Sequence, residues 1–171
     1  MRVTGIKRHR RVELGPFATF YFENFDTMWH QVHEMLHIEH GGEAQIADEL
    51  EAYNPLIPQG SELVATVMFE IDDPKRRDTV LATLGGIENC TYLSIGNERI
   101  VGEADPTREN TSSEGKASAV QFVRFPFSPE QTVRFKDPKT MALIGIDHPR
   151  YGHIAVMPGT VRAALAEDFA P

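Results

Sequence analysis

The segment from Glu62 to Ile71 constrains the fold of this chain most, because every second residue in it is apolar. The apolar positions are Leu63, Ala65, Val67, Phe69 and Ile71. The positions between them include Glu62, Thr66 and Glu70. Successive side chains of a β-strand point to opposite faces, so this period of two predicts a strand with one buried face. Such a strand needs neighbouring strands and a covering layer.

Further strands and several helices are expected on both sides of this segment. Strands are expected as a pair within 12–22, as a hairpin of 91–95 with 99–103, and at 119–127, 141–147 and 153–157. Helices are expected at about 26–40, 43–53, 74–84 and 158–169. Gly41-Gly42 leaves so short a turn that the first two helices should form an antiparallel pair over about 25–53. The chain is therefore expected to be α+β, a mostly antiparallel sheet with helices packed on one side.

Length and composition favour one cytoplasmic domain over residues 1–171. No apolar run approaches the roughly 18 residues of a membrane span, and the N-terminus lacks the apolar core of a signal peptide. Cys90 is the single cysteine, so no internal disulfide can form and a reducing compartment fits. The polar segment 104–118 is expected to be a flexible loop, with a lid as the alternative.

The net charge of −8 is distributed unevenly along the chain. Residues 1–12 form a basic arm without an acidic group, and its basic residues are Arg2, Lys7, Arg8, Arg10 and Arg11. The acidic remainder argues against nucleic-acid binding. The arm is expected to hold a phosphate or an acidic partner, or to pair with the protein's own acidic surface.

Four of the seven histidines lie in the helix expected at about 26–40, at positions 30, 33, 37 and 40. Spacings of three, four and three place them on one stripe, about 120° from the centre of the helix's apolar face. His33, Glu34 and His37 match H-E-x-x-H, in which two histidines bind a metal and the glutamate is the general base. A zinc or iron site is one expectation, and a solvated or partner-facing polar stripe is the alternative.

A metal site at this helix needs a third ligand, and the sequence leaves its identity open. His30, His40 and Glu43 are the nearby donors, but Gly41-Gly42 interrupts the helix before Glu43. The longer metal-binding form of the motif requires a glycine and a histidine at positions where this chain has His40 and Glu43.

Glu39 is the unusual residue of the same helix, because helical spacing places it inside the apolar face. A carboxylate there needs a partner, and Arg124 or the arm residues Arg8, Arg10 and Arg11 are expected to supply it. The alternative is a functional acid in a cleft.

Several short motifs spread along the chain resemble one bacterial family. They are Lys7-Arg-His-Arg-Arg-Val12, Leu14-Gly15-Pro16, Phe22-Glu-Asn24, Glu34-Met35-Leu36 with Glu39, Asp73-Pro74, Gly86-Ile87-Glu88, Ser118-Ala-Val-Gln121, Arg124-Phe125 and His148-Pro149-Arg-Tyr151. Together they resemble domain of unknown function 3501. That family brings no established activity, but its genes often lie near rubrerythrin-like and iron–sulfur oxidoreductase genes, which implies redox or metal metabolism. Its pattern also favours other residues at the positions of His30, His33 and His37.

Three functional hypotheses follow. The first is a small cytoplasmic accessory protein of redox or metal metabolism, with an iron–sulfur or rubrerythrin-like partner. It would bind an anionic ligand or that partner through Lys7, Arg8, Arg10, Arg11 and Arg124, with Glu34 and Glu39 as the candidate functional acids. The second is a metal-binding protein or zinc- or iron-dependent hydrolase using His33, Glu34 and His37. The third is a structural homodimer that associates beside Trp29.

Overall fold

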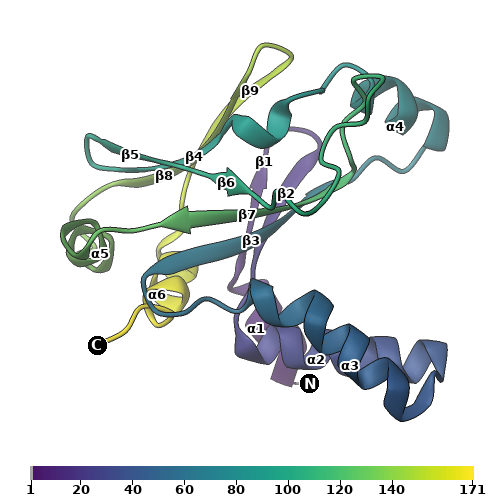
Figure 1. Cartoon of the computed structure of the whole chain (residues 1–171). Helices are drawn as coiled ribbons and strands as arrows, with labels where there is room; N and C mark the ends of the chain where they lie inside the picture. The colour runs from purple at the N-terminus through teal and green to yellow at the C-terminus, as the bar shows by residue number, and fades with distance from the viewer. Residues whose placement is uncertain (1) are drawn as a thin grey trace.

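The computed structural model describes residues 2–171, with side chains from residue 4 onward, and within this range it is an α+β fold with two antiparallel sheets (Figure 1). The helices are α1 (Arg2–Arg8), α2 (Phe25–Glu39), α3 (Gly42–Tyr53), α4 (Pro74–Leu81), α5 (Pro129–Lys136) and α6 (Gly159–Ala166), with the 3-10 turns η1 (Asn54–Leu56) and η2 (Ile87–Asn89). The strands are β1 (Arg11–Leu14), β2 (Ala18–Phe22), β3 (Glu62–Phe69), β4 (Thr91–Ile95), β5 (Glu98–Val101), β6 (Glu103–Ala104), β7 (Val120–Pro126), β8 (Ala142–His148) and β9 (Tyr151–Val156). The predicted α+β class with antiparallel strands is confirmed.

The strand predicted from the alternation, β3, lies in the middle of the first sheet. The order of that sheet is β1-β2-β3-β7-β6, and the order of the second is β5-β4-β8-β9. The alternating apolar residues of β3 are buried in the main core, as their spacing predicts. The inner faces of both sheets contribute to this core. Because β1 contacts β9 and β5 contacts β7, the two sheets nearly enclose it.

The expected strand 99–103 is interrupted at Gly102, where the chain passes from one sheet to the other. β5 pairs with β4 before this residue, and β6 pairs with β7 after it. A Cβ atom at Gly102 would lie 2.1 Å from Thr91 Oγ1 and 2.6 Å from Val123 Cγ1. Only glycine fits this corner, and the strands before and after it belong to two different sheets, whereas a single sheet was expected.

The predicted antiparallel helix pair is confirmed as α2 and α3. A second, small apolar cluster joins the helix pair to the first sheet. In it Met28 of α2 packs with Leu56 of η1 and Val64 of β3. Beyond it the pair projects past the sheet (Figure 1). Phe25 and Trp29 are therefore 62% and 55% exposed, although they belong to the apolar set of the helix.

The N-terminal segment is not a free arm. Residues 2–8 form α1, and Arg11 and Val12 belong to β1. α5 was not predicted, although Ser128 and Gln131 form the capping box that begins it. Within residues 2–171, none of the helices has the length and apolar character that crossing a membrane requires.

The polar segment 104–118 is joined to the body by several hydrogen bonds. Thr111 Oγ1 donates to Glu88 Oε2 at 2.7 Å and accepts from the Gly86 N–H at 3.0 Å. The Ala117 N–H donates to the Leu81 carbonyl at 3.0 Å. The flexibility of this loop stays a prediction.

Candidate functional site

A cavity of about 320 Å³ lies between α1, α2, η1 and the outer face of the first sheet, and we call it the Glu23 cavity. Its apolar and aromatic lining residues are Tyr21, Phe22, Met28, Tyr53, Leu56, Met68, Val120 and Phe122. Its polar lining residues are Lys7, Arg10, Glu23, Thr27, Gln31 and Thr66. A mainly apolar hollow with a few polar groups is the usual form of a small-molecule site.

Glu23 places a carboxylate in this apolar surrounding, with 9% of the residue exposed. Its Oε2 atom accepts a hydrogen bond of 2.6 Å from Thr27 Oγ1, and its Oε1 atom accepts one of 2.8 Å from Thr66 Oγ1. Among the side chains that the structure describes, no Lys, Arg or His nitrogen lies within 4 Å of this carboxylate. The carboxylate is thus held by neutral donors, and each oxygen can accept another hydrogen bond.

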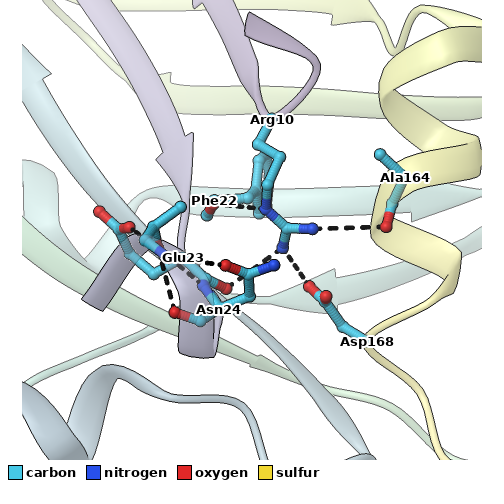
Figure 2. Close-up of polar contacts among 7 residues, drawn as sticks. Arg10, Phe22, Glu23, Asn24, Ala164 and Asp168 are labelled. Carbon is cyan, nitrogen blue, oxygen red and sulfur yellow. Dashed lines mark hydrogen bonds and ion pairs between the residues drawn. The ribbon is translucent and has the colours of Figure 1, made fainter. Parts of the chain in front are cut away.

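The position of Glu23 follows from the joint between β2 and α2 (Figure 2). Its N–H donates to the Val64 carbonyl at 2.8 Å, so the backbone is still attached to β3. Asn24 then caps α2, because its side chain accepts from the Thr27 N–H while the Thr27 hydroxyl accepts from the Asn24 N–H. The partial positive charge at the start of α2 also favours a carboxylate here.

Arg10 and Asp168 form a buried ion pair behind this joint (Figure 2). The Arg10 guanidinium also donates to the carbonyls of Phe22 at 3.0 Å and Glu23 at 3.2 Å. A fourth bond, of 3.4 Å, reaches the Ala164 carbonyl of α6. Burial raises the pKa of the Asp168 carboxyl, and the hydrogen bond and charge of Arg10 partly offset this increase. Arg10 therefore positions the main chain at Glu23.

The predicted basic residues do not converge on one site. Lys7 is half-buried and lines the Glu23 cavity with Arg10, whereas Arg8 is exposed and does not line it. Arg11 pairs with Glu13 on the surface. The positive charge of Arg10 is paired with Asp168. Of the two predicted basic residues that line the cavity, Lys7 is therefore the one whose charge could interact with a ligand.

Arg124 lies at a different groove, of about 780 Å³, between α3, η1, β7 and the loop after β6. Its Nη1 atom is 2.6 Å from Glu62 Oε2, which corrects the expected pairing with Glu39. Leu56 and Phe122 line both this groove and the Glu23 cavity, so they form the partition between the two.

Glu39 is exposed, and its Oε2 atom accepts a hydrogen bond of 2.8 Å from Gln45 Nε2 at the start of α3. Helical spacing placed it on the apolar face, but the end of α2 has passed beyond the sheet, so no core lies opposite it (Figure 1). Glu34 is also exposed, with Oε2 3.3 Å from His30 Nδ1. That contact permits an ion pair when the imidazole is protonated, but its geometry is not that of a hydrogen bond.

The histidine stripe does not form a metal centre with three ligands. The His33 ring lies against the Trp29 ring at an interplanar angle of 32°, with centroids 3.9 Å apart, and its Nδ1 atom lies 2.8 Å from the Trp29 carbonyl. His37 and His40 have ring centroids 6.0 Å apart. Among the described side chains, no three His, Cys, Asp or Glu residues are grouped closely enough to hold a metal ion. The expected third ligands, His30, His40 and Glu43, thus do not complete a site with His33 and His37.

Glu23 was not among the residues predicted from the sequence to be functional. One signal was present, because Glu23 separates an apolar strand from a helix cap within Phe22-Glu23-Asn24. Its burial depends on Thr66, which is 43 residues away and belongs to β3. No local pattern predicts that contact.

Comparison with known proteins gives the family of the chain and no activity. The family model described as a protein of unknown function (DUF3501) matches residues 1–169. A crystal structure from Burkholderia pseudomallei, described as a novel protein of unknown function, is 37% identical with a TM-score of 0.90. The match covers 99% of this chain and 88% of that one. No curated protein matches the chain. The resemblance noted in the sequence is confirmed, and the chain belongs to the DUF3501 family.

Proposed function

We propose that this protein is a small accessory protein that binds a small-molecule ligand in the Glu23 cavity. The observation that carries this proposal is a buried carboxylate with free acceptor capacity in a mainly apolar cavity of about 320 Å³. An apolar ligand body would replace water along Met28, Met68 and Phe122. A polar group on the ligand would complete the hydrogen bonding of Glu23.

An anionic ligand, which the basic N-terminal segment had suggested, has weaker support. Arg10 faces Asp168, and Arg11 faces Glu13. Lys7 alone would have to neutralise the anion, and the Glu23 carboxylate would oppose its binding.

Methionine methyl groups offer a direct test of ligand binding in this cavity. The probe is 2-phenylethanol, a neutral molecule with an apolar body and one hydroxyl, titrated into protein with ¹³C-labelled methionine methyl groups. Met28 and Met68 line the cavity, whereas Met141 is exposed elsewhere and Met157 lies in the main core. We expect saturable shifts of the Met28 and Met68 signals and unchanged Met141 and Met157 signals.

A cavity-filling variant controls this measurement. Val120 lies opposite Met68 on β7 and lines the cavity, so V120W should block it and abolish the shifts. Val156 is an exposed strand valine of the second sheet, so V156W should bind the probe as the wild type does. Shifts in V120W equal to those in the wild type would reject the proposal, and so would the absence of shifts both with this probe and with charged probes that have the same phenylethyl body.

The place of the protein in metabolism is proposed from the family resemblance alone. A cytoplasmic location and a redox or iron–sulfur partner belong to this proposal. A further proposal is that the protein forms a homodimer through the surface beside Trp29. The exposure of Phe25 and Trp29 favours it.

A further inference from the structure

We infer that the polar group received by Glu23 is a positively charged nitrogen, so that the ligand class is a small organic amine with an apolar or aromatic body. This inference rests on the proposed function. It concerns the charge of the ligand, which cavity shape alone does not determine.

Glu23 has no countercharge among the side chains that the structure describes. Its carboxylate is buried and accepts hydrogen bonds from two hydroxyls, Thr27 Oγ1 and Thr66 Oγ1. Both donors are neutral, and the ion pairs formed by the described side chains do not include Glu23. A buried carboxylate is stabilised most by a cation that also donates hydrogen bonds. An ammonium group supplies both at once.

Aromatic side chains line the Glu23 cavity. Tyr21, Tyr53 and Phe122 contribute rings to it, whereas the Phe22 ring packs in the main core. The face of an aromatic ring attracts a cation, and this attraction is stronger where water is excluded. A carboxylate combined with aromatic rings favours an organic cation over a neutral alcohol or a carboxylic acid.

The other charged groups of the cavity are compatible with this ligand. Arg10 is paired with Asp168, so those two charges largely cancel. Lys7 lines the cavity from α1 and carries the remaining positive charge. Its Nζ atom does not lie within ion-pair distance of Glu23, and its flexible side chain can turn toward solvent when an amine binds.

Three probes with the same phenylethyl body and different charge separate the possibilities. They are 2-phenylethylamine, 2-phenylethanol and 3-phenylpropionate, each titrated while the Met28 and Met68 methyl signals are followed. We expect the wild type to bind the amine about tenfold or more tightly than the alcohol, because a charge-assisted hydrogen bond replaces a neutral one. We expect 3-phenylpropionate to bind most weakly.

Two glutamine variants test the carboxylate itself. E23Q should lose the preference for the amine while still binding the alcohol within about twofold, because its side chain keeps its size and loses its charge. E34Q removes an exposed carboxylate of α2 that does not line the cavity, so it should keep the wild-type preference. K7M should bind the amine at least as tightly as the wild type, since one repulsive charge has been removed.

The outcomes distinguish this inference from the proposed function. If the amine and the alcohol bind equally and both shift Met28 and Met68, the inference is wrong and the proposed function stands. If 3-phenylpropionate binds more tightly than the amine, and K7M loses that binding, the cavity is an anion site and the inference is also wrong. If none of the probes shifts either methionine, the proposed function itself fails. The wild-type comparison decides the matter even if E23Q does not fold.

Discussion

The guanidinium of Arg10 and the carboxylate of Asp168 form an ion pair across 158 positions of the sequence, with side chains only 5% and 6% exposed. The remaining donors of Arg10 are directed at main-chain carbonyls of Phe22, Glu23 and Ala164. One side chain therefore joins the residues before β1, the end of β2 and the C-terminal helix region. The joint that carries Glu23 depends on this contact (Figure 2).

Replacement of Arg10 by methionine should destabilise the protein strongly. The Asp168 carboxylate would remain buried without its cation, and breaking a buried pair in this way costs about 3–5 kcal/mol. Urea unfolding at neutral pH measures the loss. The double variant R10M/D168L should recover most of it, since both charges are then replaced by apolar groups of similar size. A double variant no more stable than R10M would contradict this account.

The loss in R10M should also depend on pH. Burial raises the pKa of Asp168 above its ordinary value of 3.8, and removing Arg10 takes away the contributions that lower it. Between 3.8 and the raised pKa the folded state binds more protons than the unfolded state, so stability falls as pH rises through that window. Because the pKa of Asp168 is raised further in R10M, this decrease in stability with pH is larger in the variant than in the wild type. Urea titrations should therefore give the smallest stability difference between wild type and R10M at about pH 4 and the largest at about pH 7.

Removal of the Thr66 hydroxyl should destabilise the protein, because the buried carboxylate of Glu23 then loses one of its two hydrogen-bond donors. T66V keeps the shape of the side chain but deletes the bond of 2.8 Å to Glu23 Oε1, with an expected loss of about 1–3 kcal/mol. Thr91 provides a matched control, because its Oγ1 atom is buried without a hydrogen-bond partner among the described residues. T91V should be neutral or stabilising by up to about 1 kcal/mol. Equal losses in the two variants, measured by urea unfolding, would show that the contact with Glu23 has no special role.

Local patterns predicted much of the fold and little of the site. The alternation in β3 and the Gly41-Gly42 turn are short-range features, and each element that they predicted is present. The corner at Gly102 depends instead on Thr91 and Val123, which belong to two other strands. The burial of Glu23 likewise depends on Thr66. Contacts of this kind exist only after the strands have paired, so no periodicity in the sequence carries them.

The helix pair should loosen when Gln45 is replaced by alanine. Gln45 Nε2 donates to Glu39 at 2.8 Å and to Glu49 at 3.0 Å, while its Oε1 atom accepts from the Gly41 N–H at 2.8 Å. Q45A removes these contacts around the turn between α2 and α3, and also a longer one of 3.4 Å from Nε2 to the Met35 carbonyl. Hydrogen exchange should become faster in this turn, by an amount equivalent to about 1 kcal/mol, and should not change in β3. Q59A, which removes one local bond to the Ile57 carbonyl, should leave exchange in the turn unaltered.

Metal content provides the final prediction. The two histidines of H-E-x-x-H lie one turn apart on α2 without a third donor among the described side chains, and stable zinc sites in proteins use three or four protein ligands. The Nδ1 atom of His33 is already engaged by the Trp29 carbonyl, so only its Nε2 atom could bind a metal. We therefore expect untagged protein to contain well under one equivalent of zinc or iron, and the H33A/H37A variant to contain the same amount.

The metal measurement also decides between the second hypothesis and the Glu23 cavity. Stoichiometric metal in the wild type that is lost in H33A/H37A would require a ligand from another molecule, because the described residues of the chain supply too few. A second copy of the protein, joined at the exposed surface beside Trp29, could provide it, and the variant would then also lose its dimer in size-exclusion chromatography. Metal-free protein that still binds 2-phenylethanol would instead leave the cavity as the functional site of this chain, with the histidine stripe as a polar surface.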